Sequence, residues 1–196
     1  MQAPGRHALL LAPPGTGKTL LLHVLATRLP SELHAVYVPN PRLTPAELCA
    51  WTLGRLDSPR WPDPMAMLRA YAAHRAQCGG ALVWLIDDAH RLPVATARWL
   101  AEAATRGDGG LRLVFAADDE GSGADDAEGD GLAVFRDLVR IDSLSQPMQP
   151  PEIAQYVFER LYRARGSDAL RERCAAALDT IREASGGIPR AVNAAC

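Results

Sequence analysis

The sequence lacks a long hydrophobic run, and we therefore predict that this chain contains no transmembrane helix. The longest uninterrupted apolar run, Ala81–Ile86, is far shorter than the about 20 residues that a membrane-spanning helix requires. A signal peptide is rejected as well, because the apolar stretch Leu9–Leu11 behind Arg6 is too short and leads directly into a glycine-rich loop.

The sequence also lacks a strong net charge, and it lacks cysteines at the spacing of metal ligands. The four cysteines share no such spacing, and we interpret them as reduced thiols of a cytosolic protein: Cys49, Cys78, Cys174 and Cys196. The net charge of −2 argues against broad nonspecific affinity for DNA, although it leaves a local basic patch open. With 196 residues, 48% of them hydrophobic, the chain suits one globular domain or a core domain with a small appendage.

The most informative feature that is present is a glycine-rich loop between a predicted strand and a predicted helix. The loop Ala12–Thr19 follows the apolar run His7–Leu11 and precedes the apolar stretch Leu20–Ala26. This is the strand–loop–helix context in which such a sequence binds phosphate. The predicted nucleotide-binding residues are consecutive: Pro14, Gly15, Thr16, Gly17, Lys18, Thr19 and Leu20.

Each part of this loop has a chemical reason. Gly15 and Gly17 let the backbone curl so that its amide N–H groups point at an anion, and the helix that follows adds its positive dipole end. We expect Lys18 to reach the β- and γ-phosphates and the Thr19 hydroxyl to ligate Mg²⁺. Ala12 stands where the strict motif has glycine, and it is small enough to leave room for the loop.

A second constellation is the apolar run Leu82–Ile86, which ends in two carboxylates, Asp87 and Asp88. We expect this strand next to the strand of the phosphate loop, with Asp87 holding Mg²⁺ through water and Asp88 orienting the attacking water. Most relatives of this pattern carry Glu in place of Asp88, and a misplacement of roughly 1 Å can cost on the order of 100-fold in rate. We therefore expect either that Asp88 supports only slow hydrolysis or that a nearby acid serves in its place. His90, which follows, is interpreted as a strand-end or helix-cap residue.

Apolar periodicity predicts strands and helices in alternation, and hence a parallel sheet flanked by helices. The predicted strands are His7–Ala12, His34–Val38, Ala81–Ile86 and Leu111–Ala116. The predicted helices are Lys18–Arg28, Pro45–Leu56 with Thr44 and Glu47 as a capping box, Met65–Cys78, Val94–Thr105, Pro151–Arg165, Ala169–Ala184 and one that begins after Pro189. The acidic, glycine-rich stretch Asp118–Gly131 predicts a solvated loop.

Together with two C-terminal stretches, these motifs resemble the AAA+ ATPases. The chain is most similar to the general-secretion-pathway protein A type, which includes pilus-biogenesis and transposition-helper ATPases. Ala184–Asn193 resembles the Ser-Gly-Gly-Ile-Pro-Arg signature of this type, and Pro151–Leu161 resembles its Glu-x-x-x-Tyr helix. The resemblance covers His7 to Asn193 and implies ATP, with Mg²⁺, as the cofactor.

The resemblance implies an α/β P-loop NTPase core over residues 1–145 and a small all-helical lid over residues 146–196. Because the sequence stops inside a predicted helix, we expect either a minimal relative or a fragment of a longer protein. By the same resemblance, Arg190 is the sensor 2 arginine that reads the γ-phosphate, and Asp118 is sensor 1 at the end of the fourth strand. The arginine finger, which acts on the site of a neighbouring subunit, is Arg140, with Arg136 as its competitor.

The leading hypothesis is an ATPase that hydrolyses ATP slowly and drives conformational or assembly changes in a protein partner. The resemblance implies a role in secretion or pilus-type assembly, a nucleotide-dependent homo-oligomer, and a place in the cytoplasm, peripheral to the inner membrane through a partner. Two alternatives stay open. One is a nucleotide-binding interaction module with little hydrolysis, and the other is a helper ATPase of DNA transposition or replication, which the near-neutral charge disfavours.

Overall fold

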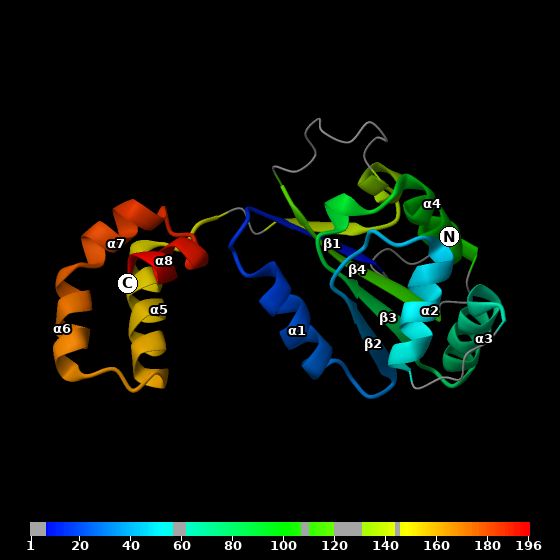
Figure 1. Cartoon of the computed structure of the whole chain (residues 1–196), viewed down its shortest axis with the longest axis horizontal. Coiled ribbons are helices and arrows are strands. Elements are labelled where there is room, and N and C mark those ends of the chain that lie inside the picture. The colour runs from blue at the N-terminus through cyan, green and yellow to red at the C-terminus, as the bar shows by residue number, and fades with distance from the viewer. Residues whose placement is uncertain (1–6, 57–61, 107–109, 120–130, 144–145) are drawn as a thin grey trace. The chain divides into compact units, whose positions relative to one another are not determined.

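A computed structural model of the chain describes residues 7–56, 62–106, 110–119, 131–143 and 146–196 (Figure 1). Its internal contacts divide the chain into two compact units. The first comprises residues 1–12 and 18–143, and the second comprises residues 13–17 and 144–196. Most of the predicted acidic loop, residues 120–130, lies outside the described residues.

The first unit is built on a five-stranded sheet in the order β2-β3-β4-β1-β5. Every neighbouring pair is parallel, as the alternation of strands and helices predicts. The strands are β1 (Ala8–Ala12), β2 (Leu33–Val38), β3 (Ala81–Ile86), β4 (Leu111–Asp118) and β5 (Arg140–Ser143). The predicted fold class, a parallel sheet flanked by helices with a helical C-terminal region, is confirmed.

One expectation about the sheet is wrong. We expected the strand that carries Asp87 to lie next to the strand of the phosphate loop, but β4 lies between β3 and β1. The physical reason is that a crossover connection can skip a strand position, so the order along the chain does not dictate the order in the sheet. The acid still reaches the same edge, because parallel strands end on one side of the sheet.

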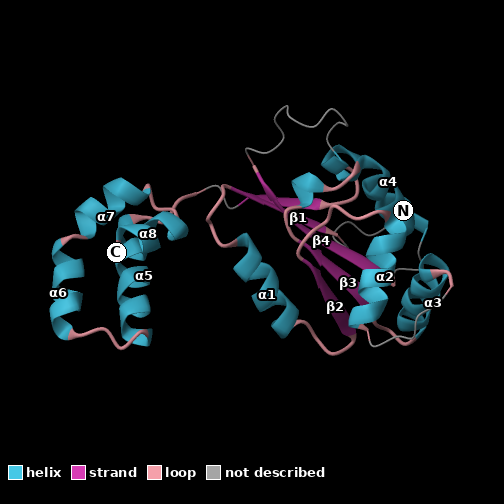
Figure 2. Cartoon of the chain, viewed as in Figure 1, coloured by secondary structure: helices cyan, strands magenta, loops and turns pink. Residues whose placement is uncertain are grey.

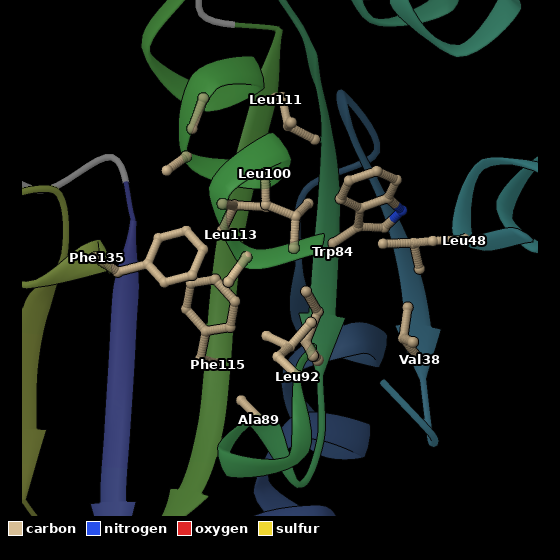
Figure 3. Close-up of a cluster of buried hydrophobic side chains, with 14 of the residues drawn as sticks. Val38, Leu48, Trp84, Ala89, Leu92, Leu100, Leu111, Leu113, Phe115 and Phe135 are labelled. Carbon is tan, nitrogen blue, oxygen red and sulfur yellow. The ribbon is translucent and has the colours of Figure 1, made fainter. Parts of the chain in front are cut away.

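Helices cover both faces of this sheet (Figure 2). Side chains alternate along β3, so that Val83 and Leu85 face α1 (Lys18–Arg28), where they pack against Leu22. Trp84 points to the opposite face, into a larger cluster with Leu100 (Figure 3). That face is covered by α2 (Pro45–Arg55), α3 (Pro64–Gln77) and α4 (Val94–Arg106). All six residues of β3 are buried, which explains its uninterrupted apolar sequence.

The start of α2 follows from local sequence. The Thr44 hydroxyl accepts a hydrogen bond from the backbone N–H of Glu47 (3.3 Å), and the Glu47 carboxylate accepts one from the backbone N–H of Thr44 (2.8 Å). This is the predicted capping box, and Pro45 occupies the first turn, where a missing N–H does no harm. The hydrogen bonds from the Thr44 backbone and hydroxyl lower the pKa of Glu47.

Two short 3₁₀ helices complete the described part of the first unit: η1 (Ala89–Arg91) and η2 (Gly131–Phe135). Phe135 packs against Phe115 with ring centroids 4.6 Å apart (Figure 3). β5 follows η2 and pairs with β1, with Ala8 opposite Arg140. All four residues of β5 are exposed. This edge strand therefore has no alternation of buried and exposed residues by which its sequence could have predicted it.

The second unit has a small core of its own. Its helices are α5 (Pro150–Arg163), α6 (Asp168–Ala176), α7 (Leu178–Ser185) and α8 (Pro189–Ala195). The buried side chains are Ile153, Val157, Cys174, Ile181 and Val192. Among the described residues, no helix is both long and apolar enough to cross a membrane.

The single helix expected over Ala169–Ala184 is wrong, because the chain bends at Ala177 between α6 and α7. The N–H of Ala177 is shared between the carbonyls of Arg173 and Cys174, at 3.1 and 3.2 Å, and its φ of −98° and ψ of 3° depart from helical geometry. Cys174 and Ile181 lie on either side of this bend, and both are buried in the cluster that α5 completes. The bend changes the direction of the chain so that α6 and α7 both pack against α5, whose Ile153 and Val157 lie in the same cluster.

Candidate nucleotide-binding site

The carboxyl edge of the sheet brings together several of the predicted site residues of the first unit. β1 ends at Ala12 and β4 at Asp118, which lies directly opposite it in the ladder. Asp87 follows β3, and α1 begins at Lys18. Ligands of open parallel sheets bind outside this edge, where loops and helix starts converge.

The loop 13–17 joins β1 to α1 and has the backbone that its glycines predict. Gly15 and Gly17 have φ angles of +86° and +99°, which side-chain-bearing residues rarely adopt. The Thr16 hydroxyl donates to the Pro13 carbonyl at 2.8 Å and tightens the turn. The roles of Pro14, Gly15, Thr16, Gly17 and Leu20 in nucleotide binding stay predictions, and Leu20 is 67% exposed.

Lys18 is held at the junction of β1 and β4. Its side chain is only 8% exposed, and its ammonium donates to the Ala12 carbonyl at 2.8 Å. The same nitrogen lies 2.6 Å from Oδ1 of Asp118, a charge-assisted contact. Two of the residues that the sequence predicted on separate grounds therefore touch one another.

Thr19 and Asp87 also meet. The Thr19 hydroxyl donates to Oδ2 of Asp87 at 2.7 Å, and Asp87 is 5% exposed. A hydroxyl and a carboxylate are the hard oxygen ligands that Mg²⁺ prefers, and Mg²⁺ in such sites keeps several waters and takes the remaining ligands from phosphate. Among the described residues, no group of three or more His, Cys, Asp or Glu could hold a metal ion by itself. The residues present therefore fit a magnesium ion that is bound together with nucleotide.

Tyr37, on β2, is a member of this cluster that sequence reasoning missed. Its hydroxyl donates to the same Oδ2 of Asp87 at 2.9 Å, and its ring lies against His23 with centroids 4.3 Å apart. Burial, the hydrogen bond to Asp87 and the charges of Asp87 and Asp88 raise the pKa of Tyr37 to about 12, so the phenol remains a donor. The sequence does show a tyrosine one residue before the end of an apolar strand. Its contact with Asp87 could be predicted only by knowing that β2 lies next to β3.

Asp88 has an unusual backbone. Its φ of 47° and ψ of 40° are left-handed, a conformation that Asp adopts more readily than most residues with a side chain. Its N–H donates to Oδ1 of Asp87 at 3.1 Å. The carboxylate of Asp88 is 42% exposed and lies 3.6 Å from the Arg91 guanidinium. The acid expected to orient water is therefore paired with a cation.

Of the three arginines that the resemblance predicts as site residues, Arg136 and Arg140 belong to the first unit and Arg190 to the second. Arg140 begins β5, at the opposite end of the β1–β5 pair from Ala12; it is 72% exposed and pairs with Asp142 at 3.0 Å. Arg136 is exposed in the turn before it. Within the second unit, the backbone N–H of Arg190 donates to the Gly15 carbonyl at 3.1 Å, and Arg190 is exposed. The roles proposed for these arginines stay predictions.

A parallel sheet with a glycine-rich loop, a buried lysine and a hydroxyl–carboxylate pair at its carboxyl edge defines a P-loop nucleotide-binding protein. The chain belongs to the AAA family: residues 2–120, more than half of its length, match the family model described as an AAA domain. The sequence matches none of the curated proteins. This agrees with the AAA+ resemblance at the level of the family.

Solved structures share the fold over most of the chain. The Orc2 protein of Aeropyrum pernix, solved as ADPNP and ADP complexes, is 14% identical with a TM-score of 0.64, over 96% of this chain and 54% of that one. An alanine-to-serine mutant of RuvB from Thermotoga maritima is 22% identical with a TM-score of 0.57, over 95% of this chain and 52% of that one. The Orc1 protein of Aeropyrum pernix in complex with DNA is 18% identical with a TM-score of 0.56, over 83% of this chain and 44% of that one. The chain thus spans about half the length of these structures, and at such identities the likeness shows the fold alone.

Proposed function

We propose that this chain binds Mg·ATP at the carboxyl edge of its sheet and hydrolyses it slowly to change the conformation or assembly of a protein partner. The observation that carries the proposal is the cluster at this edge. The buried Lys18 stands at the start of α1, and the Thr19 hydroxyl lies 2.7 Å from the buried Asp87. AAA-family membership supports the proposal.

The residues divide the chemistry among themselves. The N–H groups of loop 13–17 and of the first turn of α1 bind phosphate oxygens, and Lys18 offsets the charge of the β- and γ-phosphates. Mg²⁺, when bound with nucleotide, neutralises phosphate charge. Thr19 and Asp87 would hold this ion. Asp88 orients the water for in-line attack on the γ-phosphate.

The remaining site roles are part of the same proposal. Arg190 reads the γ-phosphate, and Arg140, or Arg136 in its place, completes the site of a neighbouring subunit in a nucleotide-dependent homo-oligomer. An arginine finger of this kind contributes about 10³–10⁵ in rate. Arg140 is exposed and lies opposite Ala8, at the far end of β1 from Ala12, and both observations support action in trans. Asp118 takes the sensor 1 position, and its contact with Lys18 supports a place beside the phosphates.

The partner and location are proposed from the resemblance to the general-secretion-pathway protein A type. We propose a core of residues 1–145 with a lid of residues 146–196, acting in the cytoplasm and peripheral to the inner membrane through a partner in secretion or pilus-type assembly. The independent core of the second unit supports the division into core and lid.

The deciding experiment measures ATP binding and ATP turnover for the native chain and for Lys18→Ala across protein concentration. We expect turnover to rise more than linearly with concentration, because the arginine comes from a neighbour, and to disappear in the variant. Arg106→Ala, which removes an exposed arginine that pairs with Glu102 at 3.6 Å at the end of α4, is the matched control. Absence of ATP binding by the native chain would refute the proposed function.

The second candidate is a nucleotide-binding module with little hydrolysis, and the geometry of Asp88 favours it. The side chain of Asp88 is one methylene shorter than that of Glu, and its carboxylate lies 3.6 Å from the Arg91 guanidinium, which competes with water for it. Asp88→Glu separates the two functions. A gain in turnover of ten-fold or more, at unchanged ATP affinity, indicates a site tuned to hold ATP, whereas a fall in turnover indicates that Asp88 is itself the working acid.

A DNA-linked role is a third candidate, suggested by the fold shared with the Orc1 protein solved in complex with DNA, but the charges of this chain disfavour it. Acids accompany arginines on the helices of the second unit: Arg171 pairs with Asp168 at 2.9 Å, and Arg182 with Asp179 at 3.6 Å. A titration of duplex DNA against salt tests it, because phosphate contacts produce a steep loss of affinity with rising salt. We expect weak binding with a shallow slope.

A further inference from the structure

The contact between Asp118 and Lys18 places a negative charge beside the ammonium that the proposed function uses to bind phosphate. The Lys18 ammonium has three N–H donors, of which one meets the Ala12 carbonyl at 2.8 Å and another faces Oδ1 of Asp118 at 2.6 Å. Lys18 is 8% exposed and Asp118 is 26% exposed, so water screens this pair less than it screens a surface ion pair.

The position of Asp118 is held by the sheet and not by its side chain alone. Asp118 is the last residue of β4 and lies opposite Ala12. The Ala12 carbonyl also accepts from the N–H of Asp119 at 3.3 Å, and the N–H of Asp118 faces Nδ1 of His90 at 3.4 Å. The carboxylate therefore cannot leave Lys18 by a movement of the strand end without breaking these contacts.

A carboxylate at this position affects two nucleotides unequally. In a P-loop site the backbone N–H groups of the loop cradle the α- and β-phosphates, whereas the lysine reaches the β- and γ-phosphates. A γ-phosphate beside Lys18 therefore approaches Asp118, and the two negative charges repel each other. A nucleoside diphosphate lacks that phosphate and keeps its loop contacts. A neutral side chain would spare the triphosphate this repulsion.

We infer that Asp118 is a specificity-determining residue that biases the site toward nucleoside diphosphate over nucleoside triphosphate through its contact with Lys18. This inference rests on the proposed function, because it assumes that the loop binds nucleotide. Its consequence is that the unassisted chain favours the ADP-bound form, and that the ATP-bound form needs a compensating positive charge from elsewhere.

The test measures the dissociation constants of MgATP and MgADP for the full chain by calorimetry, and compares their ratio among variants. Asp118→Asn keeps the shape and removes the charge, and we expect ATP affinity to rise about tenfold relative to ADP affinity, equivalent to about 1.4 kcal/mol. Asp118→Glu keeps the charge and is expected to retain a preference for ADP. Glu102→Gln removes one charge from an exposed pair on α4 and should leave the ratio unchanged.

The outcomes separate this inference from the proposed function. If both nucleotides bind the native chain and Lys18→Ala weakens both, nucleotide binding as proposed stands. If Asp118→Asn then leaves the ratio of ATP affinity to ADP affinity unchanged, or lowers it, only the inference about Asp118 is overturned. A change in ratio that Glu102→Gln reproduces also overturns it, because the effect would then be one of net charge. If neither nucleotide binds any variant, both proposals fall.

Discussion

Tyr37 shows how one side chain can hold a buried carboxylate in place from a neighbouring strand. Asp87 Oδ2 accepts from both Thr19 and Tyr37, at 2.7 and 2.9 Å, while Oδ1 accepts from the N–H of Asp88 at 3.1 Å. These donors fix the rotamer of a buried carboxylate that would otherwise lack partners. Tyr37 is accordingly a positioning residue for Asp87, and its removal should affect Mg²⁺ more than nucleotide.

We predict that Tyr37→Phe raises the Mg²⁺ concentration needed for half-maximal ATP binding by about tenfold, the lower end of the range for residues that orient metal ligands. Nucleotide affinity without Mg²⁺ should change by less than about twofold. The measurement is a fluorescent-nucleotide titration at several Mg²⁺ concentrations. Tyr71→Phe removes a hydroxyl that pairs instead with His34 and serves as the control. Equal effects with and without Mg²⁺ would show that the phenol only supports the fold.

At the scale of elements, the capping box of α2 illustrates a helix start that local chemistry stabilises. The Thr44 hydroxyl satisfies one backbone donor of the first turn, and Glu47 satisfies the Thr44 N–H. We predict that Thr44→Ala lowers the free energy of unfolding by about 1 kcal/mol, measured by chemical denaturation. Thr27→Ala, whose hydroxyl bonds to the Val24 carbonyl within α1, should change it by less than about 0.5 kcal/mol. Equal losses in both variants would contradict a specific cap.

The same capping box should respond to pH. Because the pKa of Glu47 is lowered from its usual value of 4.5, its contribution to stability is fully present above that value. It is lost as the pH falls through the lower pKa of the folded state. The native chain should therefore exceed Glu47→Gln in stability at pH 7, and the difference should shrink below about pH 4.5. A difference that stays constant from about pH 7 to about pH 3 would show that the charge of Glu47 plays no part.

At the scale of the whole molecule, two separate hydrophobic cores stabilise the chain. Leu100 lies in the large core of the first unit and Ile181 in that of the second. Every tryptophan of the sequence precedes residue 100: Trp51, Trp61, Trp84 and Trp99. Tryptophan fluorescence therefore reports on the first unit, whereas circular dichroism reports on the helices of both.

We predict that Leu100→Ala destabilises the first unit by about 2–5 kcal/mol and lowers the midpoint of the fluorescence transition. Ile181→Ala should lower the midpoint of part of the circular dichroism transition and leave the fluorescence transition in place. Both probes are recorded in the same thermal denaturation. Coincident shifts of both probes in both variants would show that the chain unfolds as one cooperative body.

The sequence by itself determined the features that depend on neighbours a few residues apart. The loop Ala12–Thr19, the α2 capping box and the apolar run of β3 were all predicted, because glycine conformations, cap hydrogen bonds and burial on both faces leave local patterns. Helix α1 has the predicted bounds, Lys18–Arg28, for the same reason. The residue types of the candidate site could thus be predicted from the sequence, whereas their arrangement in space could not.

Tertiary structure alone decided which distant residues meet. In the sheet, β4 lies between β3 and β1, and the exposed β5 lies at the edge beside β1. The expected helix breaks at Ala177, and its two halves, α6 and α7, both pack against α5. Tertiary structure also brought Tyr37 to Asp87 and Asp118 to Lys18. These contacts depend on strand order and register, which are set by packing across the whole sheet and leave no periodic signal in the residues themselves.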